Sequence, residues 1–311
     1  MKIVRFNALG EPVARARTGV LLPGGRVGDL RAAYAACLIQ DGRDGLGREI
    51  AALRIPPDVR QILHHGVPAR EAMERAAAWL AERGAAEPGL LGVDGEALLF
   101  PLANVRLHNP LKPGRLVLVI GNSQQSRAAP VVVQRASAAV MGPVRDIELP
   151  AGLSGLHYGT GLAIVIGRNC HRIDAAAAAD AIAGYMTANE IRSASGVTEL
   201  GGDSAFGRYI IGPALVSAHE VPGIATQALS TRVNGTLVQS GSLADLQLPI
   251  ADLVARLSQL GLEAGDVIIT GLLSEAAPVD QAKLAQVVIG DRIESTVEGL
   301  GSTNNRVVAA A

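Results

Sequence analysis

The sequence predicts an α+β protein dominated by strands, whose larger part is a curved, mixed β roll. Most apolar segments after residue 115 are short, rich in β-branched residues and spaced as strands are. Few long helical segments alternate with them, which disfavours a doubly wound parallel sheet. Asn234-Gly235, between two of these segments, is a strong hairpin signal. We therefore expect a β roll preceded by a smaller α+β unit.

Residues 1–109 are predicted to form this small N-terminal α+β domain. Short strands are expected at the N-terminus and around a Pro-Gly-Gly turn, at Met1–Phe6, Val20–Leu22 and Arg26-Val27. An Ala-rich helix is expected from Asp29 to Leu38, and a second from Ala69 to Glu82. The second helix should end at Arg83-Gly84, because a basic residue followed by glycine is typical of a helix C-terminus.

The segment Pro110–Gly114 predicts a hinge, since two prolines and a glycine interrupt any regular element. Residues 115–311 then form the second domain. One helix is expected there, over Ile250–Leu260 and ending at Gly261. The expected strands are Leu116–Ile120, Gly161–Ile166, Tyr185–Ile191, Ile210–Val216, Ser230–Gln239 and Asp266–Gly271.

Charge and cysteine usage exclude several classes of function. The formal net charge is -1 and charges of both signs are interspersed, so no nucleic-acid or membrane-surface partner is expected. Cys37 and Cys170 offer neither a disulfide framework nor a zinc spacing. No signal-peptide pattern or membrane-length apolar run is present. We expect a cytoplasmic protein that binds a small molecule.

A series of short motifs in the second domain resembles the fumarylacetoacetate hydrolase (FAH) family, in the family's order. They are Gly142-Pro143 with Ile147–Pro150, Leu162–Gly167, Ala183-Gly184-Tyr185 with Ala188-Asn189, Ile211-Gly212-Pro213, Arg232–Gly235, Gly265–Gly271 and Val297–Gly301. The resemblance covers roughly Leu116–Val308. It implies an FAH-type β roll, a homodimer, and chemistry on 2-oxo acids or 1,3-dicarbonyl compounds, which family members hydrolyse, hydrate, decarboxylate or isomerise.

The resemblance also implies a metal site, and this chain departs from it. Family members hold a divalent cation with a Glu-x-Glu pair on one strand and an aspartate on a later strand. The pair falls here on Gly159 and Gly161, and the aspartate on Glu190. One carboxylate in place of three should not hold magnesium or manganese, so neither a metal nor another cofactor is expected. The paired glycines indicate either an enlarged pocket or relaxed selection on an unused site.

The loop after Leu116–Ile120 departs from the family as well. The family has Asn-Tyr and then a histidine that activates water; here Ser126 stands near the histidine's position. We predict that this loop, together with the strand residues around the glycines, contacts the substrate, although such loops are also ordinary surface. The predicted substrate-binding residues are Asn122, Gln124, Gln125, Ser126, Arg127, Gly159, Gly161, Arg192 and Thr270.

Four residues are candidates for acid and base chemistry. Asp203 matches the family's substrate-contacting lysine, and with Glu190 it would place an acid and a base side by side. The alternative is that each is solvated or paired with Arg192 or Arg208. His157 should share the face of Gly159 and Gly161 while Tyr158 turns away. A lone histidine is more often structural than catalytic.

We therefore expect a metal-independent member of the FAH superfamily that handles an enolisable 2-oxo acid or 1,3-dicarbonyl compound as a lyase, hydratase, isomerase or cyclase. The alternative is a catalytically inactive partner or scaffold of an active paralogue. A conventional metal hydrolase whose ligands lie elsewhere is the third possibility. A shaped polar pocket around Glu190 would distinguish the first from the second.

Overall fold

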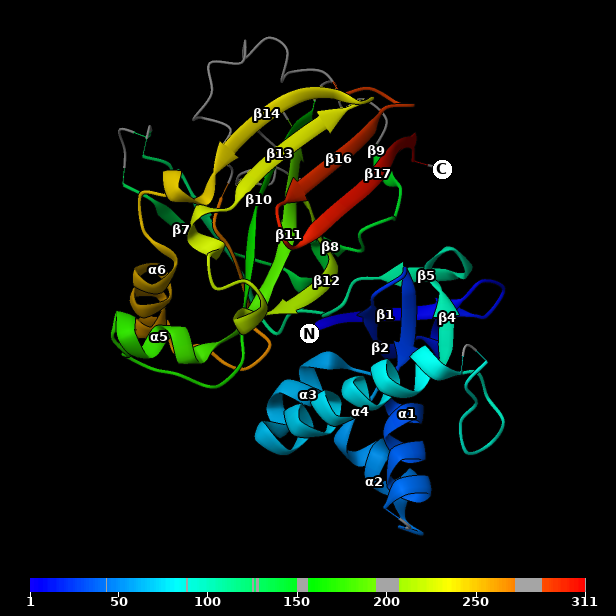
Figure 1. Cartoon of the computed structure of the whole chain (residues 1–311). Helices are drawn as coiled ribbons and strands as arrows, with labels where there is room; N and C mark the ends of the chain where they lie inside the picture. The colour runs from blue at the N-terminus through cyan, green and yellow to red at the C-terminus, as the bar shows by residue number, and fades with distance from the viewer. Residues whose placement is uncertain are drawn as a thin grey trace.

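A computed structural model describes the chain except residues 43, 88, 125, 127–128, 150–155, 194–206, 272–286 and 311, and except the side chains of residues 156–157 and 192–193. The described strands form a 12-stranded and a 5-stranded sheet, and both contain parallel and antiparallel pairs. Figure 1 shows the smaller sheet above the helical N-terminal part and against the central strands of the larger one. The predicted strand-dominated α+β fold with a mixed sheet is confirmed.

The N-terminal part contains five strands and four α-helices among the described residues. The strands are β1 (Lys2–Ala8), β2 (Arg17–Leu22), β3 (Arg26–Asp29), β4 (Leu99–Pro101) and β5 (Val105–His108). The helices are α1 (Leu30–Ala36), α2 (Gly47–Arg54), α3 (Val59–His65) and α4 (Val67–Ala86), and a π-helical turn, Cys37–Asp41, follows α1. Helix α1 begins where the sequence indicates, because the Asp29 carboxylate accepts a hydrogen bond from the backbone N–H of Ala32 at 3.1 Å.

Helix α4 is longer than expected at both ends. It begins at Val67, with Pro68 in the first turn where the absent N–H costs nothing. It also runs through Gly84 to Ala86, so the prediction that Gly84 ends the helix is wrong. A β carbon at Gly84 would lie 2.7 Å from Cδ1 of Leu99 on β4, which means that this glycine allows close packing of helix on sheet.

In the described residues of the second part lie the remaining strands and two α-helices. These are β6 (Leu116–Ile120), β7 (Val131–Arg135), β8 (Val140–Met141), β9 (Ile147–Leu149), β10 (Leu156–Ile166), α5 (Ala175–Ala181), β11 (Ile182–Ser193), β12 (Gly207–Ser217), β13 (Ala228–Val233), β14 (Thr236–Ser242), α6 (Ile250–Leu257), β15 (Val267–Ile269), β16 (Arg292–Val297) and β17 (Gly301–Ala309). Asn234 and Gly235 have positive φ angles of 50° and 82° and turn the predicted hairpin between β13 and β14.

The larger sheet joins both parts of the chain. Its main path runs β4-β3-β2-β1-β12-β11-β10-β15-β6-β7, and the junction is the antiparallel pair of β1 with β12. The smaller sheet runs β14-β13-β16-β17-β9. One core cluster lies among α1, α3, α4 and one face of the larger sheet, and another includes α5, α6 and residues of the opposite face. Strands β10 and β11 therefore have both faces covered.

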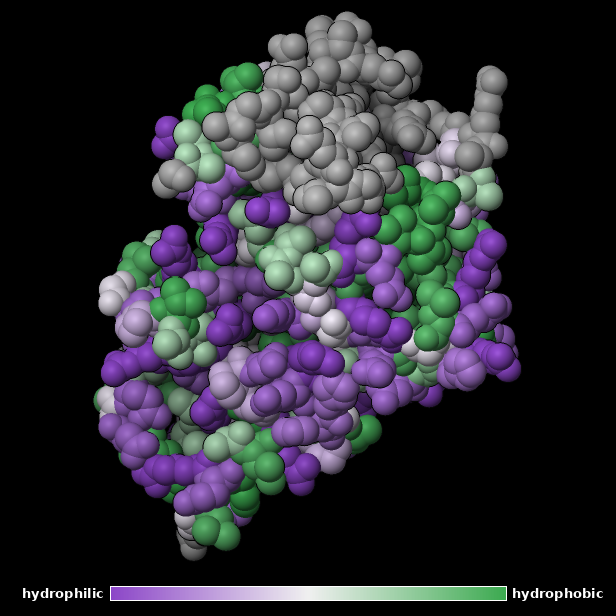
Figure 2. Space-filling model, turned by 180° about the vertical axis from the view of Figure 1, so that it is seen from behind, coloured by the Kyte–Doolittle hydropathy of each residue, from purple (hydrophilic) through white to green (hydrophobic). Residues whose placement is uncertain are grey.

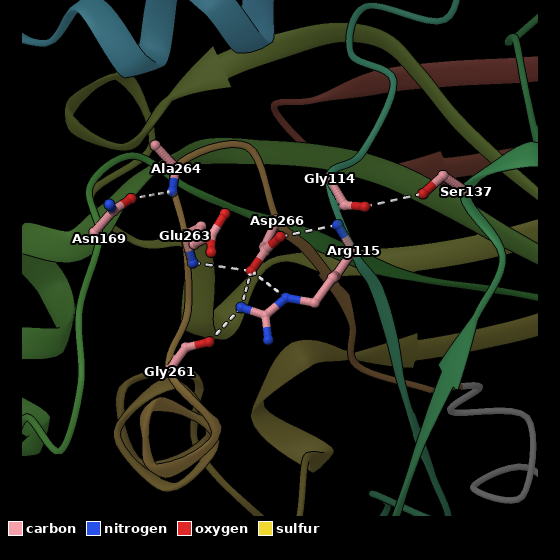
Figure 3. Close-up of polar contacts among 8 residues, drawn as sticks. All are labelled: Gly114, Arg115, Ser137, Asn169, Gly261, Glu263, Ala264 and Asp266. Carbon is pink, nitrogen blue, oxygen red and sulfur yellow. Dashed lines mark hydrogen bonds and ion pairs between the residues drawn. The ribbon is translucent and has the colours of Figure 1, made fainter.

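A buried ion pair holds the start of the parallel pair β6–β15 (Figure 3). Asp266, 1% exposed, accepts hydrogen bonds from the backbone N–H of Arg115 at 2.8 Å and of Glu263 at 2.9 Å. The Arg115 guanidinium donates to the same carboxylate through Nε at 3.0 Å and Nη2 at 2.5 Å. The fully occupied carboxylate thus fixes the turn that leads into β15.

The surface is uneven in polarity. Figure 2 shows a largely hydrophilic rear face over the helical N-terminal part and a hydrophobic patch on the side where Figure 1 places β7. Val131 and Val132 of β7 are 58% and 41% exposed. Among the described residues, no helix combines the length and the hydropathy needed to span a membrane.

Candidate active site

The candidate site is built on three adjacent strands of the larger sheet. Glu190, on β11, is paired in register with Gly159 of β10 on one side and with Tyr209 of β12 on the other. Directly paired residues of antiparallel strands project on the same face, so these three positions share one face with Gly161 and Ala188. Glu190 is only 5% exposed. A buried carboxylate therefore faces a position that has no side chain.

Tyr209 connects this face to the edge of the sheet. Its hydroxyl oxygen accepts a hydrogen bond from Nε of Arg135 at 3.2 Å, although Arg135 belongs to β7, the last strand of the main path, and β11, β10, β15 and β6 lie between β7 and β12 in that order. The contact means that the sheet curls until β7 approaches β12, as a roll requires. The sequence analysis identified neither residue, because the β11–β12 register places Tyr209 beside Glu190 and the curl of the sheet brings Arg135 of β7 to Tyr209.

Gly161 has no room for a side chain. A β carbon there would lie 2.6 Å from the carbonyl oxygen of Gly271 and 3.7 Å from Oγ1 of Thr270. Gly271 has a φ of 89°, and a β carbon on it would overlap the carbonyl oxygen of Val119. At this position, the expectation of an enlarged pocket is therefore wrong, because neighbouring backbone fills the space that the missing side chain leaves.

Thr270 supports the same contact between strands. Its hydroxyl oxygen accepts from the backbone N–H of Leu162 at 3.2 Å, and its own N–H donates to the carbonyl oxygen of Leu162 at 3.0 Å. The residue is fully buried. Thr270 thus holds the end of β15 against β10 beside Gly161, and its predicted role toward substrate stays a prediction.

The opposite face of β10 and β11 carries a buried polar network. Oγ1 of Thr160 lies 2.7 Å from Oγ1 of Thr231, and the backbone N–H of Thr160 donates to Oε1 of Gln239 at 2.7 Å. Asn189 accepts from the N–H of Gly159 at 3.3 Å. This network ties the larger sheet to β13 and β14, and it had no signal in the sequence beyond the polar residues themselves.

Tyr158 lies on that opposite face as well. It is buried in an apolar cluster with Ile191, Ile210 and Ile293, between the two sheets. Burial, with a smaller contribution from the charge of Asp291, raises the pKa of the Tyr158 phenol above its ordinary value. The structure therefore separates Tyr158 from Glu190, and the phenol stays protonated at neutral pH.

The polar loop after β6 is anchored to the segment that precedes α6. Oδ1 of Asn122 accepts from the N–H of Leu248 at 2.8 Å, and Nε2 of Gln124 donates to the carbonyl oxygen of Ala244 at 2.9 Å. The N–H of Ser126 donates to the carbonyl oxygen of Ser123 at 2.9 Å. Gln125 and Arg127 lie outside the described residues. These contacts hold the loop in place, and its role toward substrate stays a prediction.

The other predicted residues are placed only in part. His157 of β10 is paired in register with Arg192 of β11, one step of alternation beyond Gly159 and Glu190. The side chains of His157 and Arg192, and the whole of Asp203, lie outside the described residues. Their proposed roles are neither supported nor contradicted.

The described residues do not fit the divalent cation that the family resemblance implies. At the three matching positions, Glu190 supplies one carboxylate, Gly159 supplies none, and backbone excludes any side chain from Gly161. No group of three His, Cys, Asp or Glu side chains suited to a metal occurs within the described part of the chain. Such an ion needs several anionic oxygens.

Comparison with known proteins identifies the family. Residues 111–308 match the family described as fumarylacetoacetate (FAA) hydrolase C-terminal. A Mycobacterium tuberculosis protein named Rv2993c is 32% identical over 224 residues, which cover 67% of this chain and 81% of that protein. The Bacillus subtilis oxaloacetate tautomerase YisK is 29% identical over 231 residues, 68% of this chain and 76% of the tautomerase.

Solved structures of proteins with related names also resemble this chain. A 2-hydroxyhepta-2,4-diene-1,7-dioate isomerase from Mycobacterium marinum is 31% identical, with a TM-score of 0.58 over 68% of this chain and 81% of the isomerase. The structure of a maleylpyruvate hydrolase from Sphingobium sp. SYK-6 superposes with a TM-score of 0.71, and the match covers 100% of this chain and 100% of the hydrolase. At 24% identity the hydrolase shows the shared fold alone.

Proposed function

The chain belongs to the fumarylacetoacetate hydrolase family, and on this premise we propose that it is an enzyme that interconverts the keto and enol forms of a small 2-oxo acid, with Glu190 as the proton carrier and without a divalent cation. The observation that carries the proposal is the buried Glu190 carboxylate opposite Gly159, a position without a side chain. The oxaloacetate tautomerase and the dienedioate isomerase among the relatives support this class of reaction.

A single carboxylate suffices for this chemistry. Glu190 takes a proton from the carbon next to the keto group, and the electron pair of that C–H bond forms the carbon–carbon double bond as the keto oxygen becomes negative. Returning the proton from Glu190 to this oxygen completes the enol. No water is consumed, and no σ bond between heavy atoms breaks, because the C=O π bond is exchanged for a C=C π bond. Hydrolysis would in addition need an activated water and an acid for the leaving group.

The developing oxyanion needs positive partners in a site that excludes water. Tyr209 is the cross-strand neighbour of Glu190, and its hydroxyl accepts a hydrogen bond from Arg135. We assign charge stabilisation to this Tyr209–Arg135 pair, in place of the cation that other members of the family use. Arg192, one alternate position beyond Glu190, and Arg127 are further candidates for the substrate carboxylate.

The first test is tautomerisation of oxaloacetate and of simple acylpyruvates, followed by the absorbance of the enol. Glu190→Gln keeps the size and removes the base, so we expect kcat/KM to fall by about 10²- to 10⁴-fold. Glu148→Gln, on the exposed β9 position, is the matched control and should leave the rate unchanged. A wild-type rate no faster than the spontaneous reaction on every substrate would overturn the proposal and favour an inactive partner subunit.

The second test addresses the cation. Protein purified without added metal should contain less than stoichiometric magnesium or manganese, and a chelator should leave its tautomerase rate unchanged. Stoichiometric metal, or a rate lost on chelation and restored by manganese, would contradict metal independence but leave the role of Glu190 open to the first test.

A further inference from the structure

A cavity outside the candidate active site lies in the N-terminal part. Its volume is about 660 Å³, within the range of small-ligand sites. It opens to the surface and is lined by residues of the turn Val13–Arg15, β2, α1, α2 and the segment around Asp94. Alanine side chains such as Ala32, Ala35 and Ala51 make up much of its wall. Because these side chains are small, they leave the cavity open, and the charged groups that line it determine which ligands it can bind.

The carboxylates that line this cavity are already engaged within the protein. Asp94 accepts two hydrogen bonds from Arg48, at 3.2 and 2.5 Å. Glu11 accepts from Arg17 and, at 3.0 Å, from the N–H of Ala8. Asp29 caps α1, and Glu96 accepts from the N–H of Asp94 at 2.8 Å. Each of these four carboxylates therefore already accepts at least one hydrogen bond from a donor within the protein.

Two of the arginines are not engaged in this way. Among the described residues, neither Arg15, which is exposed, nor Arg31 forms an ion pair within 4 Å of a carboxylate, although their charges act on Glu11 and Asp29. The Arg31 guanidinium donates through Nε to the carbonyl oxygen of Ile55 at 3.1 Å. Arg17 is fixed in place, because its guanidinium lies over the rings of Phe6 and Phe100 at 5.3 and 5.1 Å. Its buried Nε has no hydrogen-bond partner in the described structure.

From this arrangement we propose that the cavity is a binding site for a small dicarboxylate, held by Arg15 and Arg31 with Arg17 behind them. Guanidinium groups bind carboxylates in a bidentate manner, and two of them on one cavity suit an anion with a charge at each end. The site is separate from Glu190, since it is formed by the turn Val13–Arg15, β2, α1 and α2 and not by β10–β12. It does not depend on the proposed tautomerase activity.

The test is calorimetric titration of the intact protein with succinate, at constant ionic strength, with acetate and inorganic phosphate as comparison anions. We expect succinate to bind saturably at one site, with a much higher affinity than acetate. Arg15→Gln and Arg31→Gln should each weaken it about tenfold or more. Arg75→Gln, an exposed arginine on α4 away from the cavity, is the matched control and should bind as the wild type does.

Glu190→Gln separates this site from the candidate active site. Unchanged succinate affinity in Glu190→Gln, together with weaker binding in Arg15→Gln, is the expected pattern. No saturable binding, equal affinity in Arg15→Gln and the wild type, or phosphate binding tighter than succinate would each overturn the proposal. Thermal melts of every variant show whether a loss of binding comes from a loss of folded protein.

Discussion

Gly161 of β10 lies against the carbonyl oxygen of Gly271, so close that a β carbon on Gly161 would be 2.6 Å from it. The contact closes the position that the family resemblance matches to a metal-binding glutamate. It accounts for glycine at residue 161, because any larger residue would place a β carbon against this carbonyl group.

Gly161→Ala should therefore destabilise the protein, although alanine is usually the better residue in a strand than glycine. The added methyl group must displace the backbone of Gly271, and overpacking of this kind costs about 1–3 kcal/mol. Denaturant unfolding measures the change. Gly45→Ala is the control, since a β carbon at exposed Gly45 would meet no atom within 4 Å. Equal stability of the two variants would contradict the packing argument.

Asp266→Ala should cost about 3 kcal/mol of unfolding free energy. The change leaves the N–H groups of Arg115 and Glu263 and the Arg115 guanidinium without their acceptor. The value lies at the lower end for a broken buried ion pair because the Arg115 side chain is 32% exposed. Asp180→Ala on α5, an exposed carboxylate, should change stability little. A small effect of Asp266→Ala would show that the turn is held by other contacts.

His108 should make the stability depend on pH. Burial, then the charges of Arg5 and Arg106, lower the pKa of His108 below its ordinary 6.5. The unfolded chain therefore takes up the proton more readily, so stability is present above about pH 6.5 and is lost as the pH falls toward the folded-state pKa.

Replacing His108 by Gln should remove this part of the pH dependence. The melting temperature at about pH 5 should fall less, relative to about pH 7.5, in His108→Gln than in the wild type. His171→Gln, at an exposed position, should keep the wild-type difference. The prediction fails if both variants retain the same difference.

Tyr158→Phe should keep most of the activity. The phenol lies between the sheets, on the face opposite Glu190, and its raised pKa keeps it from acting as a base at neutral pH. We expect kcat/KM to change by less than about threefold, against the loss of about 10²- to 10⁴-fold for Glu190→Gln. A comparable loss in both variants would mean that Tyr158 takes part in the proton transfer.

The local elements of the fold could be predicted because short-range physics decides them. Asp29 caps α1, Asn234-Gly235 supplies the positive φ angles of a tight hairpin, and the runs around Ile164 and Ile211 form strands. The end of α4 could not be predicted in this way. Gly84 has the pattern of a helix stop, but its use is close packing against Leu99, which is remote in sequence.

The sequence by itself determined the fold class and the family, and it indicated glycines at residues 159 and 161 where the resemblance predicts carboxylates. Strand alternation also places Glu190 and Tyr158 on opposite faces once β10 and β11 are paired. Only the tertiary structure decided that Gly271 closes Gly161 and that Arg135 reaches Tyr209. The first contact depends on the pairing of β10 with β15, and the second on the curl of the sheet. Curl and register arise from packing over the whole chain, and no short stretch of residues encodes them.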